Sequence, residues 1–213
     1  MNEILTRIGN IGIVPVVALD NAADAGDLGK ALIDGGIPCA EVTFRTAAAE
    51  ESIRILSEKY PQMLTGAGTV LTAQQADKAV AAGAKFIVSP GYNPKVVDHC
   101  VERGIPVVPG CATPSDIERA IEAGLDVVKF FPAEAAGGLP MIKAMSAPYG
   151  SVRFMPTGGI NASNICSYLA FDRVIACGGS WMVDKKLIAA GNFEEITRLS
   201  KEAVDTILGF ELA

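Results

Sequence analysis

The sequence predicts an α/β protein in which eight parallel strands, each followed by a helix, close into a barrel. Eight short apolar runs alternate with amphipathic helical segments along the 213 residues, and no long linker interrupts them. Three consecutive helical segments end at Gly83, Gly104 and Gly124, and glycine just past a helix is a common C-terminal cap. Eight βα units in a chain of this length favour a small (β/α)8 TIM barrel. A doubly wound open sheet is the alternative architecture.

The elements follow in a regular order. Residues 1–11 predict an extra N-terminal helix before the first strand, and residues 192–208 predict a closing helix. We expect residues 1–213 to form a single domain, because neither composition nor pattern changes along the chain. The candidate strands are rich in Val and Ile and apolar on both faces, as parallel strands covered by helices should be. They are 13–19, 38–44, 63–68, 85–89, 106–109, 126–131, 153–156 and 174–177.

Composition and charge exclude several classes of protein. Half of the residues are hydrophobic and 20% are charged, so the chain can bury a full core. The formal net charge of −6 argues against nucleic acid or an anionic membrane as the main partner, and no apolar run is long enough to span a membrane. Five scattered cysteines and the lack of a signal-peptide layout lead us to expect a cytoplasmic protein with reduced thiols. The single histidine, His99, leads us to expect chemistry without histidine or a transition metal.

Polar side chains interrupt the apolar strands with a spacing of two, which places them on one face of a strand. In the run AEVTFRT, Glu41, Thr43 and Arg45 share a face. In LTGAGTV, Thr65 and Thr69 alternate in the same way, and the glycines leave room for a ligand. Since the apolar faces should meet helices, we expect the polar faces to line the barrel interior.

A lysine lies in the sixth strand, DVVKFFPAE, where Lys129 shares a face with Val127 and Phe131. Burial disfavours the charged form of a lysine amine. A neutral amine can attack a carbonyl carbon and form a Schiff base. The strand therefore predicts a nucleophilic lysine, and the alternative is a purely structural buried ion pair between Lys129 and Glu41.

Paired glycines follow the seventh and eighth strands. The loops after these strands of a barrel are the usual place for a phosphate, which their main-chain amides bind. The two loops here read PTGGIN and CGGSW. Glycine lets the main chain approach an anion closely, and a serine can add its hydroxyl. We expect a phosphate site at Gly158, Gly159, Gly178, Gly179 and Ser180.

The motifs EVTFRT, GAGTVL, SPG, KFFPAE, PTGGI and GGSW, spread over nearly the whole chain, resemble those of the 2-keto-3-deoxy-6-phosphogluconate (KDPG) aldolase family. This family includes members that cleave 4-hydroxy-2-oxoglutarate. The resemblance implies a class I aldolase that releases pyruvate and glyceraldehyde 3-phosphate, with no metal or cofactor. It also implies a homotrimer whose partners are small 2-oxo acids and sugar phosphates.

The resemblance also implies a role for each matched residue. Lys129 falls on the Schiff-base lysine and Glu41 on the acid/base glutamate. The remaining matches are substrate-binding positions: Arg45 and Thr69 for the pyruvoyl carboxylate, Pro90 and Phe131 for the pyruvoyl end, and Gly159 and Ser180 for the phosphate. Thr157 matches a position where gluconate-type members carry threonine and galactonate-type relatives tend to valine.

Three other functions stay open from the residues alone. The substrate could be the galactonate epimer of the phosphorylated sugar acid. An isomerase or synthase could bind phosphate at the same loops and use Glu41 and Lys129 as an acid/base pair without an imine. A non-enzymatic barrel that binds sugar phosphates would need only the positive charge of Lys129.

Overall fold

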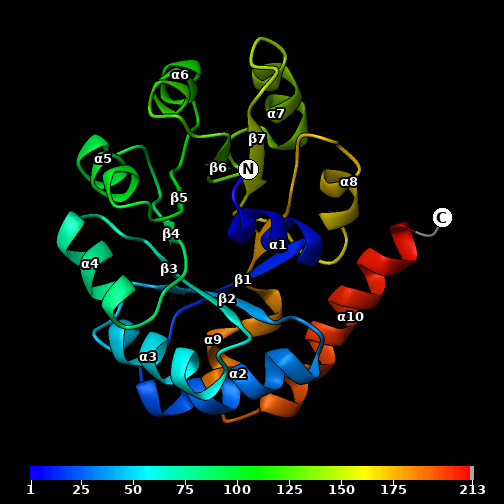
Figure 1. The fold of residues 1–213 in the computed structure, drawn as a ribbon. Helices are drawn as coiled ribbons and strands as arrows, with labels where there is room; N and C mark the ends of the chain where they lie inside the picture. The colour runs from blue at the N-terminus through cyan, green and yellow to red at the C-terminus, as the bar shows by residue number, and fades with distance from the viewer. Residues whose placement is uncertain (212–213) are drawn as a thin grey trace.

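The computed structural model describes residues 1–211 and has eight parallel strands surrounded by helices (Figure 1). The strands are β1 (Ile13–Val17), β2 (Cys39–Thr43), β3 (Leu64–Gly68), β4 (Ile87–Val88), β5 (Val107–Val108), β6 (Val127–Phe130), β7 (Arg153–Pro156) and β8 (Cys177–Gly179). The α-helices are α1 (Glu3–Ile11), α2 (Ala25–Asp34), α3 (Ala49–Lys59), α4 (Ala73–Ala81), α5 (Pro94–Glu102), α6 (Pro114–Glu122), α7 (Gly138–Ser146), α8 (Ile165–Leu169), α9 (Lys185–Ala189) and α10 (Phe193–Glu211). Two short 3-10 helices are η1 (Ala22–Asp24) and η2 (Trp181–Val183).

Neighbouring strands in the chain are also neighbours in space. One sheet has the order β5-β4-β3-β2-β1-β8, and a second pairs β6 with β7. Single bridges from Gly110 to Lys129 and from Thr157 to Gly178 connect the two sheets. This sequential order contradicts the doubly wound alternative, in which the strand order reverses at a switch point. The fold is an α/β fold of the TIM-barrel type, as the sequence predicts.

The helices begin and end where the prolines and glycines of the sequence predict. Gly83, Gly104 and Gly124 have φ angles of 105°, 66° and 78°, the left-handed region that glycine adopts without a steric penalty. Pro114 begins α6, and Thr113 before it forms a capping box with Asp116. These local signals set where each helix stops and the next strand starts.

Only β7 has the expected bounds, and the other strands differ at one or both ends. The runs 85–89 and 106–109 contain only two paired residues each, in β4 and β5. The last strand was expected at 174–177 but covers Cys177–Gly179. Val174 instead donates its N–H back to the Phe171 carbonyl and bridges Phe154, while the ladder with β1 begins where Cys177 meets Ile13.

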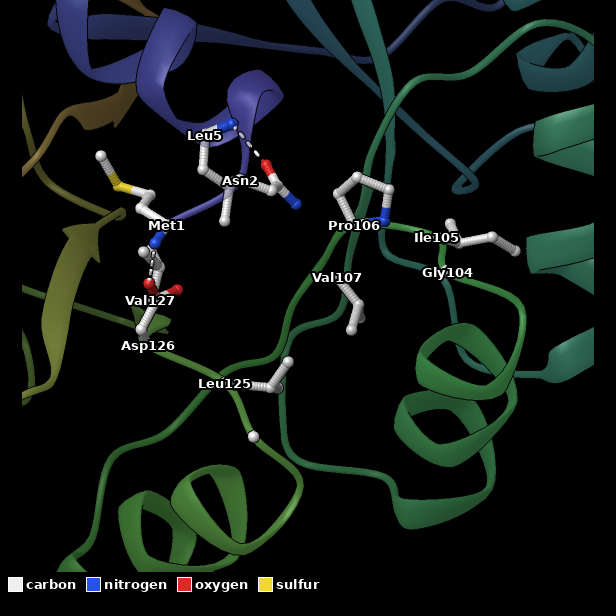
Figure 2. Close-up of a pocket in the computed structure, with 11 residues that line it drawn as sticks. Met1, Asn2, Leu5, Gly104, Ile105, Pro106, Val107, Leu125, Asp126 and Val127 are labelled. Atoms are coloured by element: carbon white, nitrogen blue, oxygen red, sulfur yellow. Dashed lines mark hydrogen bonds and ion pairs between the residues drawn. The ribbon is translucent and has the colours of Figure 1, made fainter.

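Helix α1 lies across one end of the barrel, in the middle of the ring of outer helices (Figure 1). A cavity of about 340 Å³ lies between the start of α1 and the segments that lead into β5 and β6. Figure 2 shows the residues that line it. Its lining includes Leu5, Ile105 and Leu125, and the Met1 amine pairs with Asp126 at 2.6 Å. The cavity lies where strands begin and contains no residue expected in the functional site. The apolar side chains buried between strands and helices form one continuous core.

Candidate active site

A lysine and a glutamate from different strands meet in the barrel interior. Lys129 lies on β6 and Glu41 on β2, 88 residues apart in the chain. Lys129 Nζ donates a hydrogen bond to Glu41 Oε1 at 3.3 Å, which is long for such a contact. The two side chains are 6% and 0% exposed. Burying an ion pair is costly, and stability alone is therefore a weak explanation for placing these two groups inside the barrel.

Two glycines of β3 lie on the face of the strand that Glu41 shares, and one of them, Gly68, makes room for the glutamate. Gly66 pairs with Glu41 in the strand register, and a Cβ atom on Gly68 would lie 2.1 Å from Glu41 Oε1. A Cβ atom on Gly66 would meet the ring of Phe86 at 2.3 Å. The glycines therefore occupy the interior face, and Thr65 occupies the opposite one. The expectation that Thr65 faces the interior was wrong. The threonines of this strand were expected to mark its interior face, whereas the glycines lie on that face.

The Glu41 carboxylate offers one oxygen for proton transfer. Oε1 accepts from Lys129, whereas Oε2 is buried and has no hydrogen-bond partner among residues 1–211. An unsatisfied buried oxygen costs free energy, and such atoms call for an explanation where they occur. A carboxylate with one oxygen on the lysine and one free can act as a general acid or base beside it.

A second polar pair lies just beyond the ends of β2 and β3. Arg45 Nε donates to Thr69 Oγ1 at 3.3 Å. Thr69 has a φ angle of 55°, which is uncommon for a residue other than glycine. This turn carries its side chain to Arg45, away from the face that Thr65 occupies. The exposed guanidinium has further N–H groups in a planar fork that suits both oxygens of a carboxylate.

Phe131 follows the lysine strand directly, and Pro90 follows β4. The Lys129 Nζ atom is 5.2 Å from the centre of the Phe131 ring. The Pro90 carbonyl packs so closely on Gly110 that a Cβ there would lie 2.0 Å from it, and Gly110 bridges Lys129. Gly110 therefore lies between Pro90 and the lysine strand. Of Phe131 and Pro90, only Phe131 lines the neighbouring cavity.

This neighbouring cavity, of about 280 Å³, lies at the two glycine loops. The main-chain N–H groups of Gly159, Ile160 and Ser180 have no partner among the described residues. Thr157 Oγ1 is also buried without a partner there, and a Cβ on Gly178 would approach it to 2.3 Å. Unpaired N–H groups around a cavity suit an anion. The lining consists of Val16, Arg45, Phe131, Thr157, Gly158, Gly159, Ile160, Gly178, Gly179 and Ser180.

The structure therefore brings the expected site residues into two connected groups. Lys129 and Glu41 form the buried group, and the glycine loops form the open one. Arg45 and Phe131 connect the two groups, because both line the open cavity. Phe131 also contacts Lys129, and Arg45 also bonds to Thr69 at the end of β3. The glycines of LTGAGTV were expected to leave room for a ligand, whereas Gly68 leaves room for Glu41. No role was expected for Gly110, although it stands at a strand end like the polar residues.

Neither a metal-binding cluster nor a membrane-spanning helix is found among the described residues. Residues 1–211 contain no group of three or more His, Cys, Asp or Glu side chains placed to hold a metal ion. Over the same residues, no helix combines the length and apolar character needed to cross a bilayer.

Comparison with known proteins decides the family. A model of the aldolases described as "KDPG and KHG aldolase" matches residues 4–199. The chain belongs to this family. It is an aldolase, a carbon–carbon lyase, as the sequence predicts.

Relatives within the KDPG and KHG aldolase family cover nearly the whole chain. The 2-dehydro-3-deoxy-phosphogluconate aldolase of Treponema pallidum is 51% identical over 97% of this chain and 99% of its own length. The enzyme of the same name from Haemophilus influenzae is 49% identical, over 96% of this chain and 97% of its own length. The KDPG aldolase structure from Legionella pneumophila, which holds pyruvate as a covalent carbinolamine intermediate, has a TM-score of 0.90 and 39% identity. It covers 93% of this chain and 97% of its own.

Proposed function

We propose that this aldolase cleaves 2-dehydro-3-deoxy-6-phosphogluconate into pyruvate and glyceraldehyde 3-phosphate through a Schiff base on Lys129. The observation that carries the proposal is the buried Lys129 amine, 3.3 Å from the Glu41 carboxylate. A buried lysine amine beside a carboxylate can attack a carbonyl carbon once it has passed a proton to that base. The covalent carbinolamine in the Legionella pneumophila relative supports the same chemistry here.

The reaction begins with the amine and the keto group. Lys129 Nζ attacks the C2 keto carbon, and the resulting carbinolamine loses water to give an iminium. When the C3–C4 bond breaks, its electron pair moves toward the iminium nitrogen and leaves an enamine. The C4 hydroxyl loses its proton at the same step, and its carbon becomes the aldehyde carbon of glyceraldehyde 3-phosphate. Protonation of the enamine at C3 and hydrolysis of the imine then release pyruvate and restore the lysine.

Glu41 is the group we assign to the proton transfers. Its carboxylate can accept the proton of the C4 hydroxyl and return one to the enamine through a water molecule. Because the side chain is fully buried and packed beside Gly68, it has little freedom to leave this position. We assign the substrate carboxylate to Arg45 and Thr69, and this contact fixes the keto carbon relative to Lys129. Pro90 and Phe131 then bound the pyruvoyl end.

The far end of the substrate fits the glycine loops. We assign its phosphate to Gly158, Gly159, Gly178, Gly179 and Ser180, supported by the unpaired N–H groups around the cavity of about 280 Å³. The unpartnered Thr157 hydroxyl lies in the same cavity, where it can bind a substrate hydroxyl. This residue favours the gluconate epimer over the galactonate epimer. The family description supports a second activity on 4-hydroxy-2-oxoglutarate, which shares the pyruvoyl half.

Reductive trapping tests the proposal. Treatment with pyruvate and borohydride should raise the intact mass by one reduced pyruvate adduct, and peptide mapping should place it on Lys129. The Lys129→Met variant should show neither adduct nor cleavage. An unchanged mass of the active wild-type enzyme would contradict the imine and favour an isomerase or synthase mechanism.

We also propose the following wider properties. Residues 1–213 act as one domain, in which α1 is an addition to a complete (β/α)8 barrel, and the single continuous core supports this; residues 212–213 lie outside the described residues. The enzyme acts as a homotrimer in the cytoplasm, needs no cofactor or metal and has no nucleic-acid or membrane partner. The five free cysteines fit a reducing compartment. Light scattering tests the trimer.

A further inference from the structure

The residue before helix α8 does not do what its position suggests. Asn164 is the N-cap residue of α8, where an asparagine side chain normally accepts a hydrogen bond from a main-chain N–H of the first turn. The Asn164 side chain makes no such bond. Both ends of its amide reach instead into the loop after β7, so the side chain serves the loop and not the helix.

The amide of Asn164 holds the glycine loop at two points. Its Nδ2 donates to the Gly159 carbonyl at 3.0 Å, and its Oδ1 accepts the main-chain N–H of Asn161 at 2.8 Å. The Asn161 side chain donates to the same Gly159 carbonyl at 3.2 Å. The two amides together can satisfy both lone pairs of this oxygen.

These contacts set the direction of one peptide plane. In a trans peptide, the carbonyl of Gly159 and the N–H of Ile160 point in opposite directions. The asparagines that hold the carbonyl do not line the cavity at the glycine loops, whereas Ile160 does, and the Ile160 N–H has no partner among residues 1–211. Fixing the carbonyl toward the asparagines therefore turns the N–H toward the cavity.

The local chain cannot fix this plane by itself. Gly159 has a φ angle of 82°, and glycine passes between conformations that other residues avoid. Without the two amides, the plane could turn and present a carbonyl oxygen to the cavity. An oxygen dipole there would repel the same anion that an N–H attracts.

We propose that Asn164, assisted by Asn161, is a positioning residue that aims the Ile160 N–H at the phosphate end of the substrate. The inference rests on the proposed function, because it assumes that an anionic group occupies this cavity. It assigns Asn164 to binding of the distal group alone. Lys129 and Glu41 form their contacts on other strands and do not depend on it.

The Asn164→Asp substitution tests the proposal with almost no change of shape. The aspartate keeps an oxygen for the Asn161 N–H but cannot donate to Gly159, and its carboxylate would face the carbonyl oxygen. For the phosphorylated substrate we expect KM to rise about tenfold or more, as for loss of a hydrogen bond to a charged group. We expect kcat to stay within about twofold, since the lost contact is made equally before and during reaction. Half-saturation by pyruvate in borohydride trapping should not change, because pyruvate carries no phosphate.

Matched variants separate this role from folding. Ser167→Ala removes a hydroxyl that donates to the Asn164 carbonyl at 2.7 Å but does not touch Gly159, and it should leave both readouts at wild-type values. Asn161→Asp removes the second donor and should raise the same KM, which keeps the test available if Asn164→Asp does not fold. An unchanged KM in a folded variant, or an equal rise in pyruvate half-saturation, would overturn the proposal. If the wild type itself neither cleaves the phosphorylated substrate nor traps pyruvate, the proposed function fails instead.

Discussion

Replacing Gly68 by alanine should inactivate the enzyme without touching any polar residue. The new Cβ would lie 2.1 Å from Glu41 Oε1 and 2.6 Å from its Cγ. Contacts below about 3 Å between such atoms are not tolerated, so the carboxylate has to move by roughly 1 Å. Glu41 is fully buried, which leaves no solvent space into which it can swing. Because the contact with Lys129 is already 3.3 Å long, a displacement of this size changes the geometry between the carboxylate and the amine.

The expected cost has two parts. A displacement of about 1 Å in a catalytic group can lower turnover about a hundredfold. Overpacking the core with one methyl group should also lower the free energy of unfolding by about 1–3 kcal/mol. We expect Gly68→Ala to lose cleavage activity by about two orders of magnitude while it still forms the pyruvate imine, because the lysine nucleophile itself is not displaced.

The assay compares cleavage rate, borohydride trapping and urea unfolding in three proteins. Gly66→Ala is the matched control, because its Cβ would strike the Phe86 ring at 2.3 Å on the same strand and not the glutamate. This control should lose stability and keep most of its turnover. Equal turnover in Gly68→Ala and wild type, with both folded, would show that the position of the Glu41 carboxylate is not important for the reaction.

Three further predictions concern Glu41, Gly178 and Cys111. Glu41→Gln should lose turnover far more than imine formation, measured by steady-state cleavage against borohydride trapping, and an equal loss of both would assign Glu41 to holding Lys129. Gly178→Ala should raise KM for the phosphorylated substrate more than pyruvate half-saturation, because its Cβ would displace the Thr157 hydroxyl, 2.3 Å away, and equal changes would contradict this. Burial raises the pKa of the Cys111 thiol from 9.0 to about 12. The unfolded chain therefore loses this proton first, and the thiol should lower the free energy of unfolding by up to about 1.4 kcal/mol per pH unit above pH 9, until the folded state also ionises. Urea unfolding at several alkaline pH values should show a shallower decline for Cys111→Ala, and identical slopes would refute the assignment.

The meeting of Glu41 and Lys129 could be predicted because strand periodicity is a local property. A spacing of two placed each residue on an interior face, and the barrel then brought together strands far apart in the chain. The roles of Gly68 and Gly110 were not visible in the same pattern. Their importance lies in how closely a side chain or carbonyl of another strand approaches, and only the packed structure defines that distance.

Thr69 and Asn164 show a second limit of the sequence. Strand alternation places Thr69 on the face of Thr65, but its left-handed backbone turns it to Arg45. Similarly, an asparagine ahead of a helix is expected to cap that helix, whereas Asn164 bonds to a loop. For Thr69, a contact with a residue distant in the sequence overrides the local preference. For Asn164, bonds to a loop outside the helix do so.

The side chains of Glu41 and Lys129 approach from opposite walls, because three strands separate β2 from β6 in either direction around the barrel. The gap between amine and carboxylate is therefore a measure of the barrel's width at that level. A change in the tilt or stagger of any strand would alter this width and so change the distance between the Lys129 amine and the Glu41 carboxylate. We therefore expect substitutions far from the pocket to change the reaction rate when they change the width of the barrel.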